Sequence, residues 1–201
     1  MDDQTNVKLA VTNPYQIYMR DDFQDTGSIP SGARSACQSP DIVPRPRLLD
    51  NPEELITIDW DVDMGQPLVE GLPNYIYVRG ASRDNVGAGN HVTAGVELYC
   101  VPSCLFMTPN LWERIGDDVT FTATGNDQNL LGSEPFVWTP PSRNVHYCLV
   151  ARVYTNALPN RVPASFPNNG AFIDWVLNDP GIAWRNLSIE ENHTGTVSQS
   201  Q

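Results

Sequence analysis

The sequence predicts an all-β fold: a sandwich of two sheets with seven to eight strands, an extended N-terminal arm and one short helix. Three observations lead to this prediction. Seventeen prolines and 14 glycines punctuate the 201 residues, which favours many short strands over a few long helices. Hydrophobic residues make up 40% and charged residues 18%, which is a globular composition. Apolar and polar residues alternate with a period of two over residues 92–100.

Residues 1–50 are predicted to form the extended arm and to contribute at most one strand. A short apolar piece occurs at 15–19. Prolines between residues 40 and 46 deny a sheet its backbone donors and restrict the residues before them. We therefore place the folded domain at residues 51–190 and a flexible polar tail at 191–201.

Strands within the domain are predicted from short runs rich in β-branched and aromatic residues. In the clearest run, Val92, Val96 and Leu98 share one face with the other even-numbered positions. The predicted strands cover residues 55–58, 74–79, 92–100, 119–122, 136–138, 146–155 and 182–189. The short helix is predicted over 171–177, and the Asn-Asp-Pro-Gly turn at 178–181 ends it.

The charge of the chain excludes some partners. The formal net charge is −12 and the only lysine is Lys8, so nucleic acid and anionic membranes are not expected to bind. No apolar run reaches the ~18 residues of a membrane span. The polar N-terminus carries no secretory signal. We expect a cytoplasmic protein at synthesis, exported, if at all, by a signal-independent route or as part of a particle.

The sharpest motif for chemistry is a run of carboxylates. Asp59, Asp61 and Asp63 alternate along the chain, and Glu70 follows eleven residues after the first. Closely spaced carboxylates are the hard oxygen ligands that calcium prefers. However, Met64 stands where an EF-hand loop needs glycine, and no amphipathic helices flank the run. The alternatives are therefore a calcium-binding turn and an acidic, solvent-facing strand end.

The chain has four cysteines. The sequence allows two alternatives for them: free buried thiols, or one or two disulfides. Cys100 and Cys104 lack a second pair to complete a zinc site. If the end of the 92–100 strand adjoins the start of the 146–155 strand, Cys100 can reach Cys148. We therefore predict Cys100–Cys148 as the first candidate disulfide.

No catalytic signature is present. The sequence contains no G-x-S-x-G elbow and no H-E-x-x-H helix. The paired carboxylates Glu53–Glu54 and Glu190–Glu191 lie in polar contexts that give no reason for perturbed pKa values. We predict that the chain is not an enzyme, has no catalytic residues and takes no cofactor except calcium.

Several strand motifs follow one another in a set order: SPDI at 39–42, NYIYVR at 74–79, VELY at 96–99, WERIG at 112–116, WTPP at 138–141, HYCLVARV at 146–153 and IAWRN at 182–186. Their order and spacing resemble a bacterial immunoglobulin-like module related to the CARDB (cell-adhesion-related) domains. Such modules are appended to secreted peptidases and other exported bacterial proteins. The resemblance implies an immunoglobulin-like sandwich with a supporting role, and it carries over no catalytic residues.

These observations predict a non-catalytic module for protein–protein contact or assembly in a bacterial exported or phage-like structure. The arm would add a strand to a neighbour's sheet edge, so a protein partner or self-association is expected. One alternative is a calcium- or carbohydrate-binding module, since a row of exposed aromatic side chains would bind sugars. The other is an enzyme or toxin with an unrecognised site.

Overall fold

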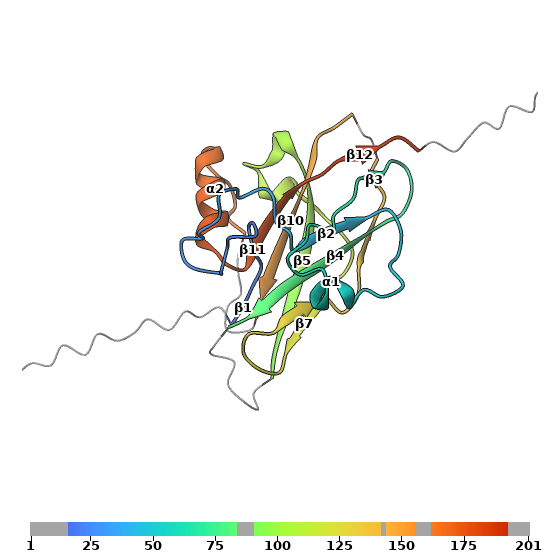
Figure 1. The fold of residues 1–201 in the computed structure, drawn as a ribbon. Coiled ribbons are helices and arrows are strands. Elements are labelled where there is room, and N and C mark those ends of the chain that lie inside the picture. Colours follow the sequence, from blue (N-terminus) through green and yellow to red (C-terminus); the bar gives the residue numbers. More distant parts are fainter. Residues whose placement is uncertain (1–15, 84–90, 142–143, 156–161, 193–201) are drawn as a thin grey trace, which may run out of the picture.

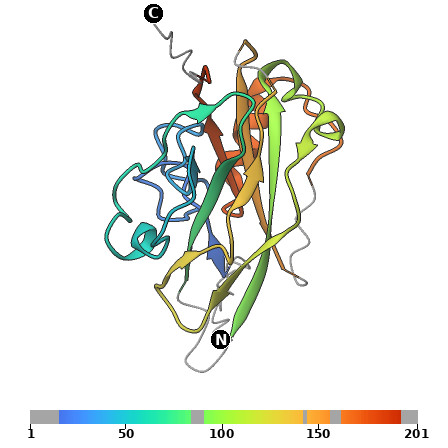
Figure 2. The same ribbon diagram turned by 90° about the vertical axis from the view of Figure 1, so that its right-hand side faces the viewer.

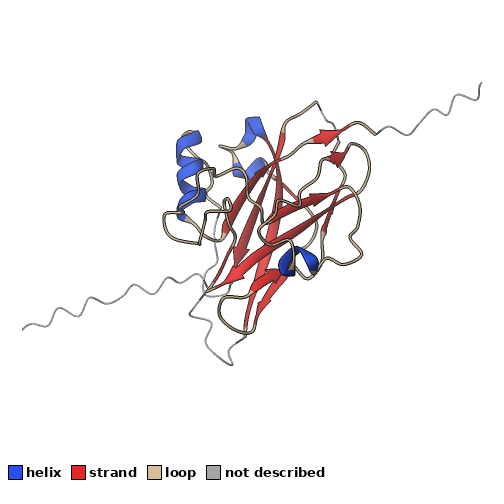
Figure 3. Ribbon diagram, viewed as in Figure 1, coloured by secondary structure: helices blue, strands red, loops and turns tan. Residues whose placement is uncertain are grey.

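The computed structural model describes residues 16–83, 91–141, 144–155 and 162–192. Over these residues the protein is mostly β, with twelve strands in antiparallel sheets and one small parallel pair (Figures 1 and 3). The strands are β1 Ile17–Tyr18, β2 Ile42–Arg45, β3 Leu68–Val69, β4 Asn74–Ser82, β5 Val92–Pro102, β6 Glu113–Arg114, β7 Val119–Ala123, β8 Asn129–Leu131, β9 Phe136–Trp138, β10 Tyr147–Tyr154, β11 Ile182–Asn186 and β12 Ile189–Glu190. The α-helices are α1 Glu54–Thr57 and α2 Asn169–Asn178.

Two five-stranded sheets dominate. In the first, β4 pairs with β1, β2, β8 and β9, and every pairing is antiparallel. In the second, β10 lies between β11 and β5, while β6 and β7 pair with β5. β5, drawn in light green, runs along most of the body in Figure 2. β3 and β12 form a small separate sheet of two parallel strands.

Both sheets contribute to one hydrophobic core. Ile76 and Val78 of β4 lie in the same buried cluster as Val96 and Leu98 of β5 and Leu149 of β10. The period of two along β5 explains its part, because Ala94, Val96, Leu98 and Cys100 are all fully buried on one face. Burying apolar surface between the sheets is the main force that holds them together.

Helix α2 covers the opposite face of the second sheet. Its buried side chains, Phe172 and Val176, pack with Phe106, Trp112 and Ile182. The side chain of Asn168 caps the helix by accepting the Ala171 N–H at 2.9 Å. The helix predicted over residues 171–177 is therefore present, with two more residues at its start and one more at its end. No helix among the described residues is long and apolar enough to cross a membrane.

Residues 55–58, predicted as a strand, instead lie mostly in the short helix α1. Only Leu55 of this segment is buried, against Val43 and Tyr77, while Ile58 is largely exposed. One turn of helix places that single side chain in the core, and Thr57 Oγ1 donates to the Glu53 carbonyl at 3.0 Å. Tertiary packing thus overrides the β propensity of the segment.

The described part of residues 1–50 is packed into the body instead of extending from it. β1 and β2 both pair with β4, and Ile17, Met19 and Ile42 lie in the shared core. The chain forms two strands where at most one was predicted. Burying these apolar side chains in the core lowers the free energy of the folded chain more than leaving them in water. The division at residue 50 therefore does not coincide with a boundary in packing. Residues 1–15 and most of the predicted 191–201 tail lie outside the described residues.

Candidate functional site

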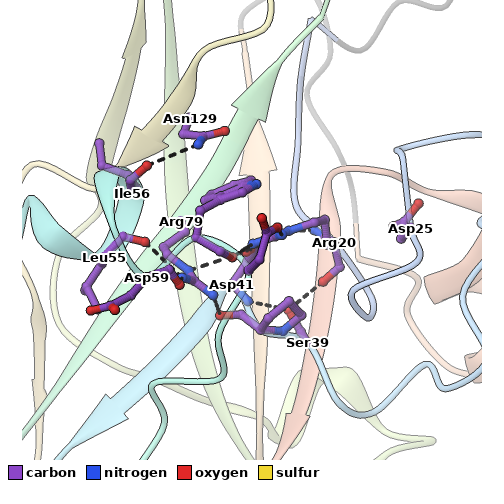
Figure 4. A network of polar contacts seen from close by, with 12 residues as sticks. Arg20, Asp25, Ser39, Asp41, Leu55, Ile56, Asp59, Arg79 and Asn129 are labelled. Carbon is purple, nitrogen blue, oxygen red and sulfur yellow. Dashed lines mark hydrogen bonds and ion pairs between the residues drawn. The ribbon is translucent and has the colours of Figure 1, made fainter.

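A buried ion network joins the two strands of the N-terminal segment to β4. Arg20 Nη2 donates to Asp41 Oδ1 at 2.6 Å, and the Arg20 backbone N–H donates to Asp41 Oδ2 at 2.7 Å. Arg79 Nε lies 3.6 Å from the same carboxylate. Figure 4 shows Asp41 between the two arginines. All three side chains are almost fully buried, so each charge depends on the others for compensation.

Arg79 also donates hydrogen bonds to backbone carbonyls in α1, in the loop after it and just before β2. Its Nη1 donates to the Leu55 carbonyl at 2.9 Å and to the Asp59 carbonyl at 2.8 Å, and its Nη2 donates to the Pro40 carbonyl at 2.5 Å. Burial lowers the pKa of the guanidinium, and the neighbouring Asp41 carboxylate acts in the opposite direction. One side chain thus fixes both the loop after α1 and the entry to β2.

Trp60 covers the network. Its ring centroid lies 3.6 Å from the Arg20 guanidinium carbon and 5.3 Å from that of Arg79. Both cations therefore face the negative surface of the indole, which stabilises charge in a site with little water. Asn129 ties the first sheet to the same loop by donating to the Ile56 carbonyl at 3.1 Å.

An open cleft of about 350 Å³ lies beside this network. It is lined by Asp22, Phe23, Cys37, Gln38, Asp63, Arg185 and Asn186. Ser39 connects the two features, because its carbonyl accepts from Arg185 Nη1 at 2.8 Å and its hydroxyl donates to the Arg20 carbonyl at 2.6 Å. The Arg185 side of the cleft is therefore attached through Ser39 to the buried ion network.

The charged groups of the cleft already have partners. Arg185 Nη2 donates to Asp63 Oδ2 at 2.8 Å. Burial by itself would raise the pKa of Asp63, but the Arg185 and Gly65 hydrogen bonds outweigh it and lower that pKa. Asp22 accepts hydrogen bonds from three backbone N–H groups, the shortest from Arg34 at 2.6 Å. These ionic groups therefore fix the positions of the segments that line the cleft.

Three other groups face solvent. Phe23 is 46% exposed, an unusual value for a phenylalanine. Gln38 and Asn186 are also exposed. Asn186 Oδ1 accepts a hydrogen bond from the Cys148 thiol at 3.0 Å, which fixes the side-chain amide. The cleft thus combines amide groups with a half-exposed aromatic ring, whose centroid lies 5.7 Å from the Arg20 guanidinium carbon.

The carboxylates predicted as calcium ligands are distributed over several contacts. The Asp59 backbone carbonyl accepts a hydrogen bond from Arg79. The Asp63 carboxylate accepts one from Arg185. Asp61 has a 91% exposed side chain, 4.0 Å from Arg20 Nη1. Glu70 follows β3, where its N–H donates to the Glu190 carbonyl. Over the described residues no group of three or more histidine, cysteine or acidic side chains is arranged to hold a metal. Calcium binding stays a prediction.

The structure does not bring Cys100 and Cys148 together. Cys100 pairs with Leu149, and Cys148 with Val101, so the two cysteines are offset by one residue across the ladder. That offset turns their side chains to opposite faces of the sheet: Cys100 into the shared core and Cys148 under α2. All four cysteines are free thiols. Burial raises the pKa of Cys100, and that of Cys148 to about 11.

No family model and no curated protein matches the chain, so the resemblance to CARDB-related modules stays a prediction. Two solved structures match. The crystal structure of AsqI with Zn has a TM-score of 0.40 and 7% identity, and the crystal structure of AsqI has 0.39 and 10%. Each alignment covers 88% of this chain but only 39% and 38% of AsqI, so this chain spans less than half of AsqI. At this identity and TM-score, AsqI transfers no activity or metal to the chain.

The predicted role in assembly of an exported or phage-like structure is wrong. The arm on which that role was based pairs within its own chain. β1 and β2 pair with β4, and Gln38 forms a bridge with Arg185 on the edge of β11. The described strands of this segment are therefore already used inside the molecule.

Sequence reasoning missed the residues that build the site. Arg79 was visible as a cation inside an otherwise apolar strand, and such a residue needs a buried partner. Its partner, Asp41, stands next to the apolar pair Ile42–Val43. No local signal marks Phe23 or Arg185, because their proximity depends on the pairing of distant segments.

Proposed function

We propose that this chain is a non-catalytic, immunoglobulin-like β-sandwich module that binds carbohydrate in the cleft beside the ion network. The two five-stranded sheets with a shared core support the sandwich part of the proposal. The observation that carries the binding part is the exposed Phe23 ring beside the amides of Gln38 and Asn186.

These groups match the chemistry of a sugar. One face of a pyranose ring carries C–H groups, which pack on an aromatic surface. Its hydroxyls both donate and accept hydrogen bonds, and an amide side chain offers the same two functions. A volume of about 350 Å³ is at the lower end of small-ligand sites, so the cleft suits one or two sugar units.

The rigidity of the floor favours binding. Ser39, Arg185 and Asp63 are joined to the buried Arg20–Asp41 pair by hydrogen bonds of 3.1 Å or less. A ligand that enters such a site loses its own freedom but does not have to order the protein as well.

The charges favour a neutral sugar over an acidic one. Arg185 is compensated by Asp63, and Asp22 is a further negative group in the wall. A uronic acid would bring its carboxylate toward these acids, and Arg185, the cation among the described residues that line the cleft, is already paired with Asp63. The net charge of −12 adds long-range repulsion of anions.

The test is a glycan array, followed by titration calorimetry with the best neutral oligosaccharide. We expect Phe23→Ala to weaken binding about tenfold, equivalent to the ~1.4 kcal/mol of one aromatic contact. Val137→Ala is the matched control, because Val137 is 53% exposed on β9 and does not line the cleft. Absence of any neutral glycan ligand, or equal affinity of the Phe23 variant and the wild type, would overturn the proposal.

A further inference from the structure

The exposed ring of Phe23 is in contact with the buried ion network. The Arg20 guanidinium carbon lies 5.7 Å from the centroid of that ring. Arg20 is 4% exposed and Phe23 46%, so the contact joins a buried cation to a side chain that lines the cleft. A cation over an aromatic ring is attracted by the electrons of the ring. The aromatic wall of the cleft therefore has a charged neighbour inside the protein.

The Arg20 guanidinium is fixed in one orientation. Its Nε donates to Asp41 at 3.1 Å, and its Nη2 donates to Asp41 Oδ1 at 2.6 Å and to the Trp60 carbonyl at 3.1 Å. The Trp60 indole packs on the same group, with its ring centroid 3.6 Å from the guanidinium carbon. A planar group that is bonded through two nitrogens and stacked on a ring cannot turn without breaking these contacts.

The backbone that carries Phe23 is fixed as well. Asp22, the residue before it, accepts the Gln24 N–H through Oδ1 at 2.8 Å. Through Oδ2 it accepts the N–H groups of Arg34 at 2.6 Å and Ser35 at 3.1 Å. These hydrogen bonds hold the turn around Phe23 against a distant segment. The freedom that remains to Phe23 is therefore rotation about its two side-chain torsions.

Rotation of an exposed aromatic ring opposes ligand binding. A half-exposed phenylalanine without a neighbour exchanges among several staggered rotamers. A ligand that stacks on the ring selects one rotamer, and the loss of the others weakens binding. Contact with a fixed guanidinium favours one rotamer before the ligand arrives, so part of this loss is removed.

We propose that Arg20 is a positioning residue for sugar binding: held by Asp41 and Trp60, it fixes the Phe23 ring in the rotamer on which the sugar stacks. The part that concerns sugar rests on the proposed function. Arg20 does not line the cleft, so it acts on the ligand through Phe23. An arginine with a purely structural role would change the stability of the protein but not the rotamer of Phe23 in the folded state.

The first test needs no ligand. Three-bond couplings between the Phe23 side chain and its backbone measure the populations of its χ1 rotamers by NMR. We expect one dominant rotamer in the wild type and averaging in Arg20→Lys, because lysine keeps the charge but lacks the planar group. Arg152→Lys is the matched control: Arg152 also pairs with an acid, Glu97, and lies 5.6 Å from the Tyr154 ring centroid, outside the cleft. Averaging in the wild type, or one rotamer in both variants, overturns the proposal.

Trp60→Leu covers the case in which Arg20→Lys fails to fold. This variant leaves the ion pair between Arg20 and Asp41 in place and removes the ring on which the guanidinium packs. We expect the Phe23 rotamers to average here as well, because the guanidinium can then shift away from the Phe23 ring. An unchanged single rotamer in Trp60→Leu would contradict the proposal.

Titration calorimetry with a neutral oligosaccharide separates the two proposals. We expect Arg20→Lys to weaken binding about three- to tenfold in the wild type, but less than about twofold in Phe23→Ala, which lacks the ring to be positioned. Equal weakening in both backgrounds overturns the positioning role and keeps the carbohydrate function. Averaging of Phe23 in Arg20→Lys, with no sugar bound by the wild type, keeps the control of the ring by Arg20 and overturns the carbohydrate function.

Discussion

A small chemical change at Asp41 should lower the free energy of unfolding strongly. Asp41→Asn replaces one carboxylate oxygen with an NH₂ group and leaves the volume unchanged. In the wild type the carboxylate receives Arg20 through Nε at 3.1 Å and Nη2 at 2.6 Å, with Arg79 at 3.6 Å. The variant leaves two buried guanidinium groups without a counter-charge and turns an amide donor toward them.

The expected cost follows from that burial. Asp41 and Arg79 are fully buried, and the Arg20 side chain is 5% exposed, so water cannot replace the lost charge. Removing one partner of a buried ion pair costs about 3–5 kcal/mol, because the remaining charge stays desolvated. We expect a loss in this range, which is a large part of the ~5–15 kcal/mol by which a domain is stable.

The assay is equilibrium urea unfolding followed by circular dichroism near neutral pH. Asp61→Asn is the matched control: it removes the same charge 4.0 Å from the same Arg20, but from a side chain that is 91% exposed. We expect that control to change stability by less than about 0.5 kcal/mol. Equal losses in both variants, or a loss below about 1 kcal/mol for Asp41→Asn, would refute the reasoning that burial sets the cost.

Three further predictions concern other parts of the molecule. Because burial raises the pKa of Asp21 to about 8, the folded protein holds this proton more tightly than the unfolded chain does, and stability should fall by about 1.4 kcal/mol per pH unit from about pH 4 to pH 8 and then level off; urea midpoints across that range check it, and Asp21→Asn should flatten the slope. Gly95→Ala should lower the free energy of unfolding by about 1–3 kcal/mol, because its Cβ would clash with the ring of Tyr154, whose hydroxyl is held by Asp118; thermal unfolding beside Gly32→Ala, where the nearest atom is 3.9 Å away, checks it. Phe172→Ala should cost about 3–5 kcal/mol by opening a cavity under α2, and urea unfolding measures the loss.

Much of the strand content was predictable because the alternation is local. The predicted strand at 92–100 is β5, the one at 146–155 contains β10, and the one at 182–189 contains β11 and the start of β12. In each, the side chains that alternate along the chain are also those that point to one face of a sheet. The error at 55–58 had a local cause as well, since a single buried leucine does not need a strand.

The site was not predictable in the same way. Its groups come from residues 22–23, 37–38, 63 and 185–186, and Asp63 and Arg185, which are bonded to each other, are 122 positions apart in the sequence. The acidic residues with the clearest pattern, Asp59 to Asp63, instead accept hydrogen bonds from arginines, Asp59 through its backbone carbonyl and Asp63 through its carboxylate. The acids with the most perturbed environment, Asp21 and Asp25, carry no recognisable motif.

The sequence by itself determined the class of elements: short antiparallel strands, one amphipathic helix and a negative surface, because period, punctuation and composition are properties of neighbouring residues. Only the tertiary structure decided that the N-terminal segment pairs with β4 in its own chain. It also decided that Cys100 and Cys148 face apart, and that an exposed phenylalanine lines the same cleft as Arg185. The reason is that strand register and the burial of charge depend on which distant segments meet, and a shift of one residue exchanges the two faces of a strand.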